Sequence, residues 1–159
     1  ARLRVIAQER DIPEELLLAK FWGEGGYFWN PETGDWSLPK DGRCNGCQWV
    51  GLRHWSPDGE VVESYSGSHG IAQIYVPVHP EYSVEMSKVD WEYCARYGAD
   101  YFRLMYDRQG NWAGAVMKYH SPGEAELGLK RVRNWLENPP TNPETGLPAW
   151  DPNPGALDG

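Results

Sequence analysis

The sequence has no excess of basic residues, no long apolar run and few cysteines. Its formal net charge is −8, and no basic stripe is present to compensate phosphate charge, so nucleic acid is not expected as a partner. No stretch approaches the ~18 consecutive apolar residues of a membrane-spanning helix, and no signal peptide is visible. The chain begins at Ala1 without a methionine, which favours a processed chain or a domain excised from a larger parent.

Only three cysteines are present, and two of them form the short motif "CNGC" at Cys44 and Cys47. A zinc site needs four ligands, and the spacing to Cys94, His54 or His69 matches no common ligand pattern. A local disulfide or a pair of free thiols is therefore the expected state of the motif. We predict no metal site and no cofactor.

Aromatic residues are abundant, with nine Trp and nine Tyr. Such residues fill cores, and their flat faces also stack on sugar rings. Most are expected to be packing residues. At 159 residues the chain is long enough for one domain with a substantial core.

Apolar spacing predicts a mostly helical fold, with helices over residues 2–11, 12–24, 89–108, 111–120 and 122–136. The third of these carries Cys94, Tyr97, Tyr101 and Leu104 along one face, which predicts a buried thiol at Cys94. Residues 27–66 are rich in Gly, Pro, Trp and Asp and predict an irregular or β-containing lobe, with "EVVESY" as a candidate strand.

The last part of the chain has no helical or strand period. It is rich in Pro and Gly, and we predict a domain over residues 1–138 followed by a tail or linker over 139–159. The sequence "NPETG" occurs twice, at 30–34 and 142–146, and each copy predicts a turn that ends in Gly.

One carboxylate lies at a notable position, in "FWGEGGYFWN". Leu17, Phe21 and Glu24 follow at i, i+4 and i+7 on one helical stripe, and the flanking glycines predict that the helix stops there. Apolar neighbours and the negative end of the helix both disfavour an ionised carboxylate. A protonated carboxyl at the junction of two lobes suits a general acid, although a surface residue beside a glycine cap would have the same spacing.

A second signal lies downstream, in "GSHGIAQIYVP" and then "AVMKYH". Together with "DIPEELLLAKFWGEGG", these motifs resemble the lysozyme superfamily over residues 10–137. They are most similar to lytic transglycosylases of the soluble bacterial type and to goose-type lysozyme. The resemblance implies an α+β, lysozyme-like fold: a helical domain with the irregular or β lobe inserted after the catalytic helix.

The resemblance also implies roles for single residues. Glu24 would be the catalytic acid and base, and the backbone at Gly70 and Ile71 would approach the sugar closely. Gln73 would bind an N-acetyl group, and Tyr119 would line the site. Without the resemblance, Gln73 would be interpreted as a loop-stabilising residue and Tyr119 as a core residue.

The aromatic residues beside these motifs are candidate sugar platforms, namely Tyr27, Phe28, Trp29 and Tyr75. Three features depart from the family pattern. Gly25 replaces a Ser, His120 replaces an Asn, and the interval from Glu24 to Gly67 is long.

The implied reaction cleaves the β-1,4 bond between N-acetylmuramic acid and N-acetylglucosamine in peptidoglycan, giving a 1,6-anhydro product. Hydrolysis is the alternative, and Glu63 is the first candidate for the second carboxylate that hydrolysis requires, ahead of Glu60, Asp58 and Asp35. A non-catalytic glycan-binding part of a phage or secretion apparatus is a further alternative. The expected partner is the glycan strand, and the expected location is the cell wall, the periplasm or a virion.

Overall fold

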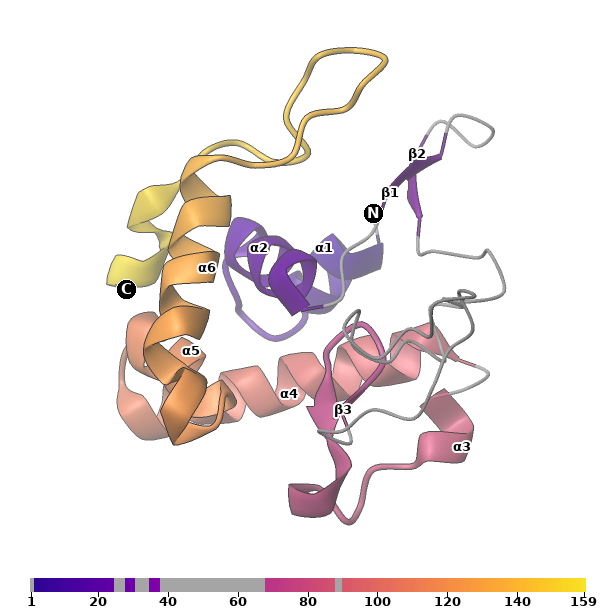
Figure 1. The fold of residues 1–159 in the computed structure, drawn as a ribbon, viewed down its shortest axis with the longest axis vertical. Helices are drawn as coiled ribbons and strands as arrows, with labels where there is room; N and C mark the ends of the chain where they lie inside the picture. The colour runs from indigo at the N-terminus through magenta and orange to yellow at the C-terminus, as the bar shows by residue number, and fades with distance from the viewer. Residues whose placement is uncertain (1, 25–27, 31–34, 38–67, 88–89) are drawn as a thin grey trace. The chain divides into compact units, whose positions relative to one another are not determined.

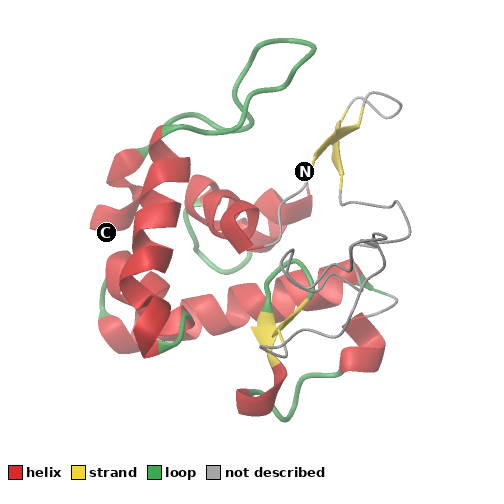
Figure 2. Ribbon diagram, in the orientation of Figure 1, coloured by secondary structure: helices red, strands yellow, loops and turns green. Residues whose placement is uncertain are grey.

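The computed structural model describes residues 2–24, 28–30, 35–37, 68–87 and 90–159 (Figure 1). The chain divides into two compact units. The first contains Ala1–Gly23 and Ala99–Gly159, and the second contains Glu24–Gly98. The described residues are mostly helical, as the sequence predicts, and Figure 2 shows few and short strands among them.

Two helices open the first unit, α1 (Arg2–Gln8) and α2 (Glu14–Glu24). Both are predicted from apolar spacing, and the inward residues Leu17 and Phe21 are fully buried. Glu14 links the two helices, because it accepts hydrogen bonds from Gln8 and, at 3.0 Å, from Arg4. These bonds, first from Gln8 and then from Arg4, lower the pKa of the Glu14 carboxyl.

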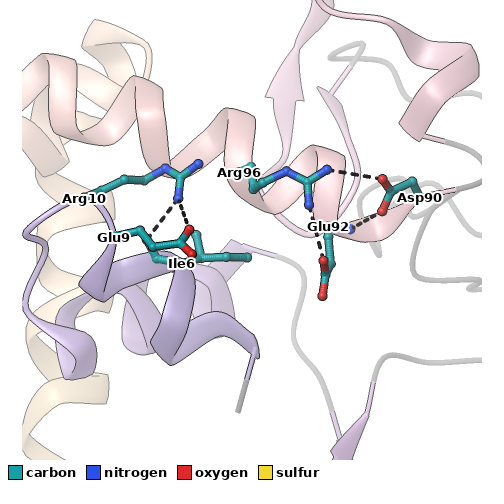
Figure 3. A network of polar contacts seen from close by, with 6 residues as sticks. All are labelled: Ile6, Glu9, Arg10, Asp90, Glu92 and Arg96. Carbon is teal, nitrogen blue, oxygen red and sulfur yellow. Dashed lines mark hydrogen bonds and ion pairs between the residues drawn. The ribbon is translucent and has the colours of Figure 1, made fainter.

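The longest helix is α4 (Trp91–Gln109), and its first turn is held by side chains. The Asp90 carboxylate accepts a hydrogen bond from the Glu92 backbone N–H at 3.0 Å, as an N-terminal cap does. Arg96 donates to both Asp90 and Glu92, each at 3.2 Å, as Figure 3 shows. The same figure shows a hydrogen bond near the end of α1, in which the Arg10 guanidinium donates to the Ile6 carbonyl at 3.1 Å.

The predicted inner face of α4 is partly wrong. Cys94 is fully buried, as expected, but Leu104 is 41% exposed. The buried stripe continues instead through Ala95, Ala99, Phe102 and Met105. The buried face is rotated from the predicted face by roughly 100°, the turn of about one residue in an α-helix, and Cys94 lies at the edge of both faces.

Two further helices complete the helical part of the first unit, α5 (Trp112–Tyr119) and α6 (Ala125–Glu137), with the 3₁₀ turn η3 (Pro122–Glu124) between them. The Asn111 side chain caps α5 by accepting from the Gly114 N–H at 2.6 Å. Val132 and Leu136 of α6 are buried, as their spacing predicts.

The segment after Asn138 does not behave as the separate tail predicted from its composition. Trp150 and Leu157 are 2% and 3% exposed, and the 3₁₀ turn η4 (Pro154–Asp158) packs along α5 and α6 (Figure 1). The Trp150 Nε1–H donates to the Trp135 carbonyl at 3.2 Å. Burying these apolar side chains fixes a segment that has no regular period of its own, and this segment belongs to the first unit.

The second copy of "NPETG" forms the turn that its sequence predicts. Asn142 accepts a hydrogen bond from Gly146 N–H at 2.9 Å, and Gly146 has a φ of 72°. Residues 31–34 of the first copy and the candidate strand at 60–65 lie outside the described residues. Two strands flank the first copy, β1 (Phe28–Asn30) and β2 (Asp35–Ser37), and they pair antiparallel.

The described remainder of the second unit contains a second short hairpin, β3 (Ser68–His69) with β4 (Ile74–Tyr75). The 3₁₀ turn η2 (Val76–Val78) and the short helix α3 (Val84–Ser87) follow it. Among the described residues, no helix has both the length and the apolar character needed to cross a membrane.

Candidate functional site

Glu24 is the last residue of α2, as the sequence predicts. It is also the residue at which the second compact unit begins. Its side chain is neither fully buried nor fully exposed. Gly25 and Tyr27 follow it and lie outside the described residues, as does the candidate second carboxylate Glu63.

Three of the predicted substrate-binding residues, Gly70, Ile71 and Gln73, lie in one turn, residues 70–73, which connects β3 to β4. Gly70 has a φ of 74° and Gln73 a φ of 50°. Gln73 donates twice to the Gly70 carbonyl, from its backbone N–H at 3.0 Å and from its side-chain amide at 2.9 Å. A residue other than Gly at positive φ is uncommon and concentrates at functional or over-determined positions.

The side chain of Gln73 thus stabilises the turn, which is the structural role considered from the sequence. This hydrogen bond uses one of its amide N–H groups, and the residue is half-buried. Ile71 is 2% exposed and anchors the turn in the core. Tyr75 points its ring outward and is 44% exposed.

Gly70 is required by its neighbours as well as by its backbone. A Cβ added at this position would lie 2.2 Å from Cys94 Sγ and 3.6 Å from the Tyr82 hydroxyl oxygen. No real side chain tolerates the first of these distances. The turn therefore lies directly on the buried Cys94 thiol of α4.

An aromatic cluster lies next to this turn in the second unit. Tyr82 stacks on Tyr93 with ring centroids 5.3 Å apart and meets Tyr97 edge-on at 4.8 Å. His79 Nδ1 lies 2.9 Å from the Tyr97 hydroxyl, and burial lowers the pKa of this histidine, which the Glu81 carboxylate partly opposes. The cluster gives the turn a rigid support.

Tyr119 belongs to the first unit, at the end of α5. It is half-buried, with its ring centroid 5.4 Å from that of Tyr101 and 6.1 Å from that of Phe102. The Lys20 ammonium nitrogen lies 3.5 Å from the centroid of the Tyr119 ring, which is a close cation–π contact.

Sequence reasoning missed Lys20. The residue is 1% exposed and is one of the largest fully buried side chains of the described structure. It precedes Glu24 by one turn of α2, so the two side chains leave the helix on the same face. Its position between Leu17 and Phe21 in the apolar stripe was the available signal, because a lysine at such a position is rarely buried without a specific contact.

His120 follows α5 as its C-terminal cap residue. Its ring fills the space over Gly128 of α6, where an added Cβ would lie 2.3 Å from His120 Cδ2. The glycine in this helix is thus explained by a close approach and not by backbone conformation.

Gly128→Ala is expected to lower the free energy of unfolding by about 1–3 kcal/mol, because the new methyl group displaces the His120 ring. In a His120→Ala background the same change is expected to stabilise the protein by up to about 1 kcal/mol, since Ala is the better helix former. Thermal or urea unfolding of the four proteins measures both values. Equal changes in the free energy of unfolding in the two backgrounds would show that the His120 ring is not the reason for a glycine at position 128.

Among the residues that the structure describes, no group of His, Cys, Asp and Glu is arranged to hold a metal ion. The motif at Cys44 and Cys47 lies outside those residues. Comparisons with protein-family models, with curated proteins and with solved structures find no match to this chain. The resemblance to lytic transglycosylases therefore rests on the motifs alone.

Proposed function

We propose that this protein cleaves the β-1,4 bond between N-acetylmuramic acid and N-acetylglucosamine in peptidoglycan. The observation that carries the proposal is the position of Glu24 at the last residue of α2, together with the 70–73 turn. These two features contain the first two motifs on which the resemblance rests. The lysozyme-like arrangement of a helical lobe and a β lobe, and a location at the cell wall or in a virion, belong to the same proposal.

In the first step Glu24 acts as general acid and protonates the glycosidic oxygen. The bond from C1 of the muramic acid to that oxygen breaks, and the N-acetylglucosamine leaves with a 4-hydroxyl group. The oxygen of the muramic acid's own acetamido group forms a bond to C1, which makes a cyclic oxazolinium ion and replaces a carboxylate nucleophile.

In the second step Glu24, now ionised, accepts the proton of the C6 hydroxyl group. O6 bonds to C1, the oxazolinium ring opens to restore the acetamide, and the product is a 1,6-anhydro sugar. Glu24 ends the cycle protonated, and no water is consumed. The tethered hydroxyl competes well with water because it is already positioned near C1.

The second unit would supply the contacts that hold the sugar. Gly70 has no side chain, so a sugar can approach its backbone closely. The exposed ring of Tyr75 offers a flat face for stacking, and Gln73 offers an amide that can donate to and accept from an N-acetyl group.

Incubation of the purified chain with insoluble cell walls tests the proposal. Release of soluble muropeptides at a rate that depends on protein concentration is the expected result. Intact walls after prolonged incubation with correctly folded protein would contradict it.

Tyr75→Ala is expected to weaken binding of glycan chains by about tenfold, because stacking of an aromatic ring on a sugar is worth on the order of 1 kcal/mol or more. Little loss of stability is expected, since the ring is 44% exposed. Calorimetric titration with solubilised glycan strands measures the affinity. Met86→Ala is the matched control, since Met86 is a similarly exposed residue of the same unit. A large drop in melting temperature with unchanged affinity would identify Tyr75 as a packing residue.

A further inference from the structure

A pocket of about 460 Å³ opens on the first unit, where the end of α2 faces α6. None of the residues predicted to bind the glycan lines it. Seven described residues form its walls: Trp22, Gly23, Leu127, Lys130, Arg131, Asn134 and Trp135. It is of a size that holds a small molecule or a few residues of a peptide.

Two indole rings and Leu127 form the apolar part of the pocket. Trp22 and Trp135 meet edge to face, with ring centroids 5.7 Å apart and an interplanar angle of 73°. Both are half-buried, so part of each ring lies against solvent. Gly23 keeps the space beside them open, because a Cβ there would lie 3.6 Å from the Trp135 ring.

The polar part of the pocket is cationic. Lys130 and Arg131 are exposed on α6, and Asn134 follows them by one helical turn. The described residues that line the pocket include no acidic side chain.

Some basic residues of the first unit form an ion pair with a described carboxylate, and others, including Arg108, Lys118 and Arg133, form none that involves a described residue. Arg4, Arg10 and Arg103 each form an ion pair with a carboxylate. Lys130 and Arg131 form no ion pair with any residue that the structure describes. In a chain with a net charge of −8, two cations without such partners beside a pair of indoles favour an anionic, partly apolar ligand.

We propose that this pocket binds the acidic stem peptide that branches from the glycan strand of peptidoglycan. Arg131 can hold a carboxylate through two parallel hydrogen bonds, Lys130 adds charge, and Asn134 can bond to a peptide group. The apolar side chains of the peptide would lie on the indoles. Neutral sugar alone would leave both cations without a counterion, and phosphate-rich polymers are disfavoured by the net charge.

Chain connectivity brings this pocket close to the candidate catalytic acid. Gly23 lines the pocket, and Glu24 follows it directly at the end of α2. A peptide branch held in the pocket would therefore help to select peptide-bearing muramic acid residues for cleavage. The identity of the polymer rests on the proposed function, whereas binding of an acidic peptide to the pocket does not require cleavage.

Calorimetric titration of the full chain with N-acetylmuramyl-L-alanyl-D-glutamate tests the inference, with the same compound amidated at both carboxyl groups as comparison. The acidic compound is expected to bind more tightly, and its affinity is expected to fall as salt is added. Arg131→Gln is expected to weaken its binding by about tenfold, as the loss of a charged hydrogen-bonding partner does. The amidated compound should show no such loss.

Arg133→Gln is the matched control, since Arg133 is exposed on the same helix but does not line the pocket. It removes the same charge and should leave the affinity almost unchanged. Equal weakening by both substitutions would show general charge attraction and overturn the inference. So would equal binding of the amidated compound, or no binding at all. Release of muropeptides from walls by a protein that binds neither compound would reject the pocket while leaving the proposed function standing.

Discussion

Glu24→Gln is expected to lower the rate of muropeptide release by ~10²–10⁴-fold or more, the usual share of a general acid. Gln keeps the shape of the side chain but can neither give a proton to the glycosidic oxygen nor take one from the C6 hydroxyl. Both steps of the proposed mechanism therefore fail in this variant. The release of soluble fragments from purified walls measures the loss.

Glu137→Gln is the control for this variant. Glu137 is also the last residue of a helix, α6, and is exposed. It should retain full activity. Circular dichroism and melting temperature should show that both variants are folded. Activity of Glu24→Gln near that of the parent protein would remove Glu24 from the mechanism.

Gly70→Ala is expected to have the largest effect on stability, a loss of roughly 2–5 kcal/mol in the free energy of unfolding. One part is the positive φ of 74°, which costs a residue with a Cβ about 1–2 kcal/mol. The other part is the clash with Cys94 Sγ, 2.2 Å from the added Cβ, which adds the cost of overpacking, about 1–3 kcal/mol. Urea unfolding measures the sum.

Two further variants separate these parts. Gly110 has a φ of 77° and nothing within 4 Å of an added Cβ, so Gly110→Ala should cost only the backbone share. In a Cys94→Ala background the clash with the sulfur disappears, and the cost of Gly70→Ala should fall toward that of Gly110→Ala. A contact of 3.0 Å to the Cβ of residue 94 would remain, so the relief should be partial. Equal costs for Gly70→Ala and Gly110→Ala would show that the turn does not lie on the thiol.

The helices could be predicted from the sequence because their signals are local. Pro13 precedes α2, and Glu14 and Glu15 form its first turn. Gly23 comes directly before its last residue. Such signals act within one or two turns of backbone. The position of Glu24 at a helix end follows from them directly, as does the Asn142–Gly146 turn.

The packing of residues 139–159 against the helices could not be predicted in the same way. Their Pro and Gly content describes what these residues cannot form, not what they pack against. Trp150 is buried through contacts made with α6, including the hydrogen bond to the Trp135 carbonyl. Contacts of this kind depend on the assembled unit and leave no period in the sequence.

Part of the candidate site was hidden for the same reason. The burial of Lys20 depends on Tyr119, almost a hundred residues away in the chain. The pocket beside Glu24 depends on α6 meeting the end of α2. The order of the motifs suggests Gly70, Gln73 and Tyr119 from the sequence. The contact of Lys20 with Tyr119 and the pairing of Trp22 with Trp135 arise only in the folded chain.

Mass spectrometry of the fragments released from purified walls tests the central claim most directly. The chain is expected to release muropeptides that end in 1,6-anhydro-N-acetylmuramic acid, and the Glu24→Gln variant is expected to release none. Products heavier by one water, with reducing ends, would show hydrolysis and would point to a second carboxylate such as Glu63. No cleavage between N-acetylmuramic acid and N-acetylglucosamine by the folded parent protein would contradict the account.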